Sequence, residues 1–96
     1  MTGGSYNGAR MNETLLLHDL PLRRPARVLS IAASASAPEW EGWLAEIGFL
    51  PGEPVMLLAC GRPGRDPLVV RIGDSTFALR RAEAACVQVA LEQAYA

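Results

Sequence analysis

Apolar residues recur at helical spacing in one stretch of the chain, just before its midpoint. The residues that follow the i, i+3, i+4, i+7 spacing of one helix face are Trp40, Trp43, Leu44 and Ile47. Ser36 can cap such a helix, or its start can shift by a residue or two, because Pro38 loses no hydrogen bond in the first turn. Glu39 and Glu41 fall near the N-terminus, where the helix dipole favours negative charge. The pattern predicts one amphipathic helix.

This helix is followed by a stop and a turn in the stretch LAEIGFLPGEPV, residues 44–55. Gly48 is expected at its C-terminal end with a positive φ, and Pro51 follows at the distance typical of a helix stop. Pro51 and Gly52 predict a turn that leads into the next strand. Phe49 and Leu50 are expected to pack back toward the core.

Alternating and continuous apolar runs predict short strands in the rest of the chain. Gly73 and Asp74, between two such runs, predict a hairpin, because glycine tolerates the positive φ of a tight turn. Residues 81–85 lack β-branched side chains and suit a single helical turn. The predicted strands are 27–32, 55–59, 68–72, 75–80 and 86–90. Five strands with one helix inserted after the first indicate a mainly β protein, a small barrel whose closure removes most sheet edges.

The segment before the first predicted strand gives weaker signals. An apolar cluster at 15–17 is followed by turn residues at 19–21. Within the first predicted strand, alternation predicts that Leu29 and Ile31 share one face, opposite to Val28.

Length and composition indicate one packed domain. The chain has 96 residues, of which half are hydrophobic and a fifth are charged, as expected for a globular unit rather than a disordered one. We expect the folded domain to span 13–92, with a flexible, polar and glycine-rich leader at 1–12 and a tail at 93–96.

The overall charge and hydropathy exclude several partner classes. A net charge of −1 gives no global attraction to nucleic acid or to an anionic membrane. No apolar run approaches the ~20 residues of a membrane helix, and no signal-peptide pattern is present, so we expect a cytoplasmic protein that does not itself span a membrane. Cys60 and Cys86 have no CxxC spacing and no neighbouring histidine, which predicts buried free thiols.

Candidate catalytic chemistry is sparse. His18 is the only histidine and lies beside Asp19, but no activated nucleophile accompanies it. Glycines 61 and 64 do not form a phosphate-binding loop, so neither an enzyme nor a nucleotide or other cofactor is predicted. Three helix acids, at 39, 41 and 46, point in different directions and form no dedicated metal site.

Charge is nevertheless distributed unevenly. The stretch 62–81 holds five arginines and two acids, a local charge of +3, and 38–47 holds three acids and no base, a local charge of −3. This asymmetry can orient a partner protein, although an ordinary mixed surface would show it too. Few aromatic residues lie between the arginines, which argues against nucleic acid. Of Trp40 and Trp43, we expect one to be buried and the other partly exposed.

Three stretches together resemble the FeoA family of ferrous-iron-transport accessory proteins. The first is the helix end, with Leu44, Ile47, Gly48 and Gly52. The second runs through Asp66-Pro67, Arg71, Ala78-Leu79-Arg80 and Glu83-Ala84, and the third is LHDLPLRRPARVLSI, residues 17–31. The match extends from about Leu15 to Val89. The resemblance implies an SH3-like barrel and a cytoplasmic, non-enzymatic partner of FeoB, a membrane protein with a G-protein domain that carries ferrous iron inward.

This resemblance leads to one main hypothesis about the site. Trp43, Phe49 and Leu50 are predicted to supply apolar contacts to the transporter, and Arg80 and Arg81 charged ones. Each also has a structural reading, in which Phe49 and Leu50 close the barrel end and Arg80 pairs with the acid at 83.

Two further functions are considered. A metal-responsive sensor or carrier, related to the SH3-like domain of DtxR-type repressors, would bind ferrous iron through His18, Asp19 and the helix acids. No winged helix precedes the domain here, so DNA binding is not implied. A polyproline-binding module would need an aromatic groove, which the few dispersed aromatics do not favour. An exposed edge strand or indole leaves homo-oligomerisation open.

Overall fold

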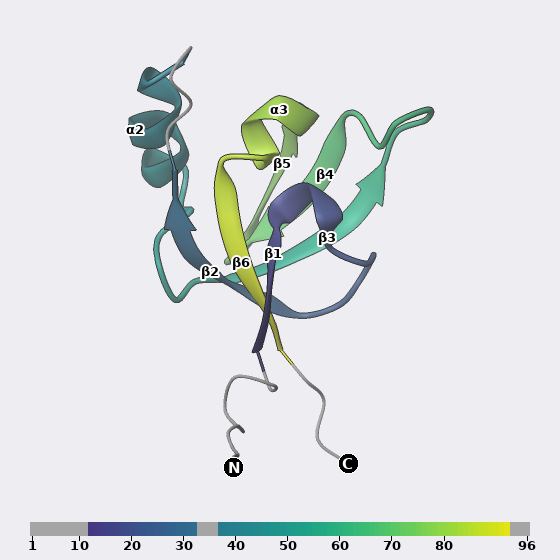
Figure 1. Cartoon of the computed structure of the whole chain (residues 1–96), viewed down its shortest axis with the longest axis horizontal. Coiled ribbons are helices and arrows are strands. Elements are labelled where there is room, and N and C mark those ends of the chain that lie inside the picture. Colours follow the sequence, from purple (N-terminus) through teal and green to yellow (C-terminus); the bar gives the residue numbers. More distant parts are fainter. Residues whose placement is uncertain (1–11, 33–36, 93–96) are drawn as a thin grey trace.

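The computed structural model describes residues 12–32 and 37–92 (Figure 1). Its elements are β1 (Asn12–Leu16), the 3₁₀ helix η1 (Leu17–Asp19), β2 (Ala26–Ile31), α2 (Glu39–Glu46), β3 (Pro54–Cys60), β4 (Leu68–Ile72), β5 (Ser75–Leu79), α3 (Arg81–Ala84) and β6 (Val87–Glu92). The predicted cap Ser36, most of the predicted leader and the predicted tail lie outside the described residues. The mainly β architecture, the single inserted helix and the helical turn before the last strand are confirmed.

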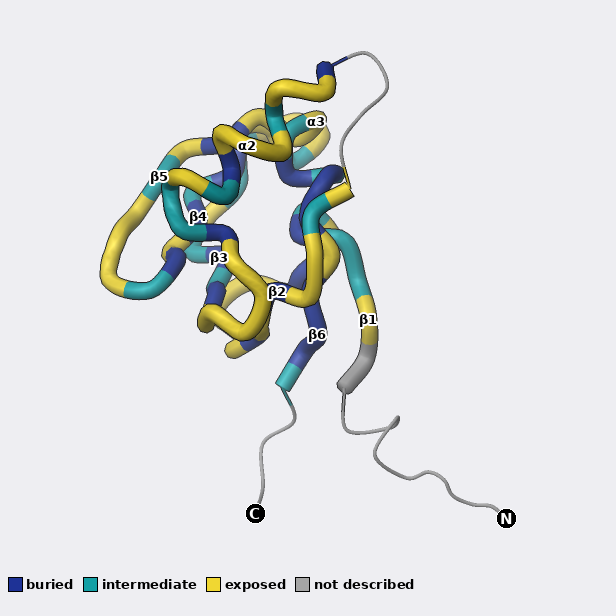
Figure 2. The backbone as a smooth tube through the Cα atoms, turned by 90° about the vertical axis from the view of Figure 1, so that its left-hand side faces the viewer, coloured by how far each residue is buried: buried dark blue, intermediate teal, exposed yellow. Residues whose placement is uncertain are grey.

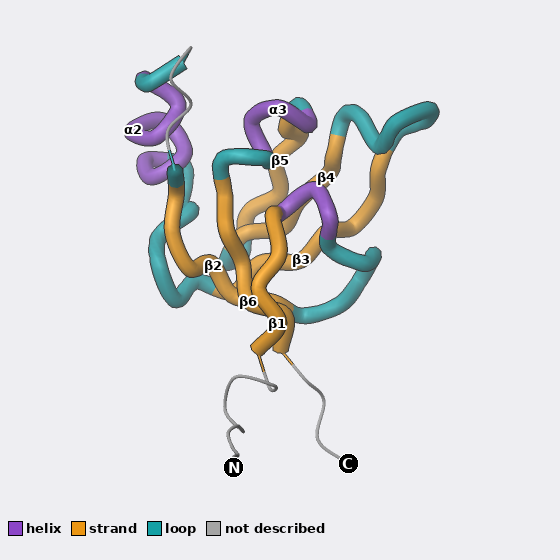
Figure 3. Tube along the Cα trace, viewed as in Figure 1, coloured by secondary structure: helices purple, strands orange, loops and turns teal. Residues whose placement is uncertain are grey.

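The strands form one antiparallel sheet in the order β1-β6-β2-β3-β4-β5, and Figure 3 shows that this sheet is strongly bent. In the described residues β1 and β5 pair with no strand on their outer sides, so the barrel-like sheet does not close. The sequence predicted five strands and the structure has six. The additional strand, β1, contains two consecutive leucines, which give no alternation from which a strand can be identified.

An irregularity in β2 changes which side chains face the core. The register between β2 and β6 shifts between Val28 and Ser30. Val28 is buried, Leu29 is 42% exposed, and Ile31 packs against the core. The prediction that Leu29 and Ile31 share a face is therefore wrong, because a β-bulge adds one residue and interrupts the alternation.

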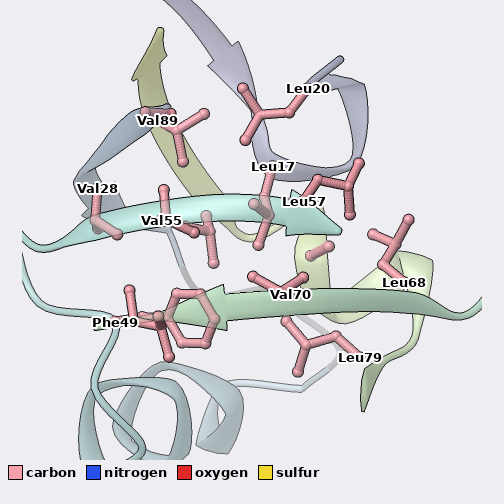
Figure 4. Packing of buried hydrophobic residues seen from close by; sticks show 14 of the residues in the cluster. Leu17, Leu20, Val28, Phe49, Val55, Leu57, Leu68, Val70, Leu79 and Val89 are labelled. Carbon is pink, nitrogen blue, oxygen red and sulfur yellow. The ribbon is translucent and has the colours of Figure 1, made fainter. Parts of the chain in front are cut away.

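The core is entirely apolar in the described residues, since none of the buried side chains is polar or charged. Its fully buried members come from strands, helices and turns alike (Figure 4): Leu17, Leu20, Leu44, Phe49, Leu57, Leu68, Leu79, Val28, Val70, Val87 and Val89. Figure 2 shows β6 as the most continuously buried strand. Cys86 is buried, Cys60 is half-buried, and both thiols are free.

Only one narrow face of helix α2 packs against the core. Leu44 is buried, Trp40 and Ile47 are partly buried and pack against the core cluster, and Trp43 is 38% exposed. One indole is partly exposed as expected, but neither indole is fully buried. Pro38 precedes the first helical residue and the helix ends before Gly48, whose φ is +121°.

Candidate functional site

Exposed apolar residues occur on three segments that meet near the C-terminal end of α2. Among the described residues, the large hydrophobic side chains that stay more than a third exposed are Leu22 (46%), Leu29 (42%), Trp43 (38%) and Leu50 (49%). The last three come from β2, from α2 and from the turn that joins α2 to β3, which are neighbours in Figure 1. We call this the helix-end surface. Solvated apolar groups of this kind are candidates for contacts with a partner.

A hollow of about 360 Å³ lies between β2 and the turn, next to Leu29 of the helix-end surface. Its lining residues are Arg27, Val28, Leu29, Pro51, Gly52, Ala90 and Glu92. Arg27 forms an ion pair with Glu92 and donates from Nη1 to the carbonyl oxygen of Gly52 over 2.8 Å. The hollow is thus bordered by both an apolar side and a fixed charge pair.

The turn itself is fixed by its backbone. Gly48 donates its N–H to the carbonyl oxygen of Ala45 over 3.1 Å, and Phe49 donates to that of Leu44 over 3.0 Å. Gly52 has a φ of +90°, a conformation that side chains disfavour. The predicted structural turn at Gly48, Pro51 and Gly52 is present, as is the hairpin glycine Gly73 with a φ of +57°.

Phe49 and Leu50, predicted to act together, have opposite environments. Phe49 has no exposed surface and packs among core side chains (Figure 4), whereas Leu50 is about half exposed. The predicted partner contact of Phe49 is therefore corrected, because its side chain belongs to the core. The expectation that Leu50 packs back toward the core together with Phe49 is wrong, and Leu50 remains available to a partner.

Arg80 and Arg81 lie elsewhere, next to the loop 61–67. Arg81 donates from Nη1 to the carbonyl oxygen of Gly64 over 2.8 Å, and its backbone N–H donates to Oδ1 of Asp66 over 3.0 Å. Arg80 is exposed, and its backbone N–H, not its guanidinium, donates to Oε1 of Glu83 over 2.8 Å. The structure thus gives Arg81 a structural role in the loop and leaves Arg80 in contact with solvent.

The same loop is tied to η1 by a residue that sequence reasoning did not single out. Arg65, with a φ of +58°, donates from Nη2 to the carbonyl oxygen of Leu20 over 2.8 Å and from Nε to that of His18 over 3.2 Å. The partners are more than forty residues away along the chain. No local pattern reports such a contact.

The candidate metal ligands form an incomplete set. Nε2 of His18 lies 3.5 Å from Oδ1 of Asp19, and Nδ1 of His18 is buried with no hydrogen-bond partner in the described part of the chain. Within residues 12–32 and 37–92, no group of three or more His, Cys, Asp or Glu side chains is arranged to hold a metal ion. The helix acids therefore do not join His18 and Asp19.

The fold and this surface define a class of protein: a small antiparallel β domain with an exposed apolar surface beside a helix end. In the same described ranges, no helix is long and apolar enough to cross a membrane. Residues 15–91 match the model of the FeoA domain. The chain belongs to the FeoA family.

Solved structures agree with this assignment. FeoA of Stenotrophomonas maltophilia, described as an SH3 domain protein complexed with zinc, is 39% identical with a TM-score of 0.71, over 78% of this chain and 88% of that one. Iron(II) transport protein A of Clostridium thermocellum is 31% identical with a TM-score of 0.70, over 80% of this chain and 45% of that one. The predicted family and SH3-like fold are confirmed. None of the curated proteins matches the chain.

Metal-dependent regulators share the fold. A manganese-dependent transcriptional repressor is 21% identical with a TM-score of 0.69, over 85% of this chain and 43% of that one. At this identity the similarity concerns the fold alone, and the predicted relation to the SH3-like domain of such repressors extends no further.

Proposed function

We propose that this chain is a cytoplasmic accessory protein of ferrous iron uptake that binds a FeoB-type membrane transporter through the helix-end surface. Membership of the FeoA family supports the link to iron transport, and relatives are described as iron(II) transport proteins. The protein acts by binding and catalyses no reaction.

The observation that carries the proposal is the exposure of Leu50, which directly precedes two residues that line the hollow, together with the exposure of Trp43 on α2. Fully burying a leucine contributes roughly 1.5–3 kcal/mol, and Leu50 keeps 49% of its surface in water, so a partner that covers it gains on the order of 1 kcal/mol from this side chain. Burying the exposed part of an indole contributes similarly, and tryptophan is among the residues that dominate binding energies. A stable interface needs about 800 Å² on each partner, so contacts must extend from the hollow over α2.

The uneven distribution of charge orients the partner as it binds. α2 carries three acids and no base, whereas Arg80 lies exposed between β5 and α3. In Figure 1 both helices lie toward the end of the molecule away from the start of β1 and the end of β6. Charges at the rim of an interface set association rate and orientation more than affinity, and we assign this role to Arg80. Arg81 contributes only indirectly, because its guanidinium and its backbone N–H hold the loop 61–67 in place.

The alternative function, binding of ferrous iron or another divalent metal, has less support. His18 and Asp19 supply one nitrogen and one carboxylate, fewer donors than a protein metal site normally uses. The Stenotrophomonas maltophilia relative is described as complexed with zinc. Calorimetric titration of Fe²⁺ and Zn²⁺ into the chain and into His18→Ala tests this function: weaker metal binding by the variant would favour it.

A binding titration tests the proposed function. The chain is titrated with the isolated cytoplasmic domain of its cognate FeoB, with and without a GTP analogue and at two salt concentrations. Leu50→Asp is the test variant and Leu22→Asp the matched control, because the two leucines are almost equally exposed, at 49% and 46%, in different turns. We expect saturable binding that only Leu50→Asp abolishes. Equal loss in both variants, or no binding by the unmodified chain, contradicts the proposal.

A further inference from the structure

The outer edge of β5 offers unused backbone hydrogen-bonding groups. β5 is the last strand of the sheet, and it pairs with β4 over five residues without the register shifts that interrupt β2–β6 and β3–β4. Ile72 and Ser75 flank the two-residue turn and form a hydrogen-bonded pair, so the bonded pairs continue at Phe77 and Leu79. Thr76 and Ala78 therefore direct their N–H and C=O groups outward.

This edge lacks the features that normally prevent strand addition. Its sequence, STFAL, contains no charge and no proline, and its ladder contains no bulge. Charges, prolines and bulges are the usual protection of edge strands. Within residues 12–32 and 37–92, no turn, loop or side-chain hydrogen bond reaches the backbone groups of Thr76 or Ala78.

The core-facing side of β5 is incompletely covered. Phe77 is only partly buried, whereas its β4 partner Val70 is fully buried. β4 has a strand on each side and β5 has only one, so part of the Phe77 ring stays in water. A strand added beside β5 with apolar side chains on this face would cover it.

The opposite face of the edge is basic. Arg71 lies across from Thr76 on β4, and Arg80 continues the outward alternation of Thr76 and Ala78 because its backbone is extended, with φ −72° and ψ 151°. Both arginines are exposed, and in the described residues neither guanidinium forms an ion pair. Adjacent strands lie about 4.8 Å apart, so an added strand lies at that distance from β5 and about 9.6 Å from β4. Acidic side chains on its outer face would therefore meet Arg80 directly and Arg71 through the length of its side chain.

A hollow lies beside the C-terminal end of β5. It measures about 360 Å³ and is lined by Asp66, Pro67, Ala78, Leu79 and Arg80. Its lining combines apolar side chains with one base, Arg80, and one acid, Asp66, so it suits an uncharged side chain at the end of an added strand. This site lies apart from Leu29, Trp43 and Leu50 of the helix-end surface, and Arg80 is the one residue that it shares with the proposed transporter contact.

We propose that the β5 edge binds an extended segment of a partner protein, in which apolar and acidic side chains alternate, as a seventh strand of the sheet. Main-chain hydrogen bonds to Thr76 and Ala78 supply affinity, as in other cases of strand addition. The alternation supplies specificity, with apolar residues over Phe77 and acidic residues facing Arg71 and Arg80.

The probe is a synthetic peptide of about seven residues, the length of a typical strand, in which Glu and Val alternate and both ends are blocked. It is titrated into the full ¹⁵N-labelled chain and followed by NMR. We expect saturable shifts and slowed amide exchange at Thr76 and Ala78. The same peptide with Lys in place of Glu should not bind, and higher salt should weaken the Glu peptide.

Charge reversal provides the decisive variants. The double variant Arg71→Glu with Arg80→Glu should weaken the Glu–Val peptide at least about tenfold and should bind the Lys–Val peptide instead. Arg24→Glu with Arg62→Glu is the charge-matched control, because both of these arginines are exposed in turns outside β4 and β5; it should leave binding within about twofold. Ala78→Pro should abolish binding by removing an outward N–H while retaining the fold, because proline is tolerated on edge strands.

Several results would overturn the proposal. These are the absence of saturation at Thr76 and Ala78 up to about 1 mM peptide, equal losses in the test and control double variants, or shifts confined to another part of the chain. Slowed exchange at the same amides that depends on protein concentration without peptide would show that a second copy of the chain occupies the edge instead.

Discussion

Gly52 donates its backbone N–H to the carbonyl oxygen of Val28 over 2.8 Å, and Val28 in turn donates to the carbonyl oxygen of Glu53 over 3.0 Å. These two bonds continue the short β2–β3 pairing, which otherwise joins only Ala26 to Val55 and Arg27 to Pro54. The turn after α2 is thus an extension of the sheet. Because the backbone is fixed on both sides, the exposed apolar groups of the helix-end surface hold their relative positions without a partner.

Glycine substitutions at two positions of the same helix region should have opposite effects on stability. Gly48 has a φ of +121°, and an added Cβ would have room beside Ile72, so Gly48→Ala is strained by backbone conformation alone and should cost about 1–3 kcal/mol. Gly42 lies inside α2 with nothing near an added Cβ, so Gly42→Ala should stabilise by about 0.5–1 kcal/mol. Urea denaturation measures both, and destabilisation of similar size in the two variants would refute the explanation.

The adjacent residues Phe49 and Leu50 should separate folding from binding. Phe49→Ala removes a fully buried ring and should lower the free energy of unfolding by about 3–5 kcal/mol. Leu50→Ala removes a half-exposed side chain and should change it by less than about 1 kcal/mol. Thermal unfolding of both variants provides the measurement. A larger loss of stability for Leu50→Ala would mean that Leu50 closes the barrel end after all.

Arg65 should stabilise the loop 61–67 through its contacts with η1. Arg65→Ala deletes the donors to the carbonyl oxygens of His18 and Leu20, and we expect a loss of roughly 1–3 kcal/mol together with faster amide exchange in the loop. Arg62→Ala is the control within the same loop, because Arg62 is exposed, and should stay within about 0.5 kcal/mol of the unmodified chain. Equal effects would show that loop charge, and not these bonds, matters.

The two tryptophans allow a spectroscopic test of the helix-end surface. Trp43 is 38% exposed, whereas Trp40 packs against the core. In Trp40→Phe the emission of Trp43 should shift to shorter wavelength when the FeoB cytoplasmic domain binds, because its indole leaves water. In Trp43→Phe the remaining indole is already packed, and its emission should barely move. The reverse pattern would contradict a contact through Trp43.

The elements predicted correctly from the sequence are those with local signals. The position of α2 follows from apolar spacing and the end at Gly48, and β4 and β5 follow from clean alternation around Gly73. The outward position of Leu29 follows from a bulge against β6, and that bulge depends on residues almost sixty positions away. The contact between Arg65 and η1 is likewise formed only in three dimensions.

The candidate site was predicted only in part for the same reason. Phe49 and Leu50 are adjacent and both apolar, and nothing in a single sequence distinguishes which one the fold buries. Arg80 and Arg81 are identical in type, and only the positions of Gly64 and Asp66 give Arg81 a structural role. The pair of Arg27 and Glu92 is separated by 65 residues, so its place beside the hollow could not be foreseen.

NMR mapping of the full, isotope-labelled chain with its cognate FeoB cytoplasmic domain tests the central claim most directly. We predict that binding perturbs the amides of Leu29, Trp43, 48–50 and 52–53 first, and that Leu50→Asp removes these changes while Leu22→Asp preserves them. Perturbations confined to η1 or to the β5 edge, with none around Leu50, would contradict the assignment of the transporter contact to the helix-end surface.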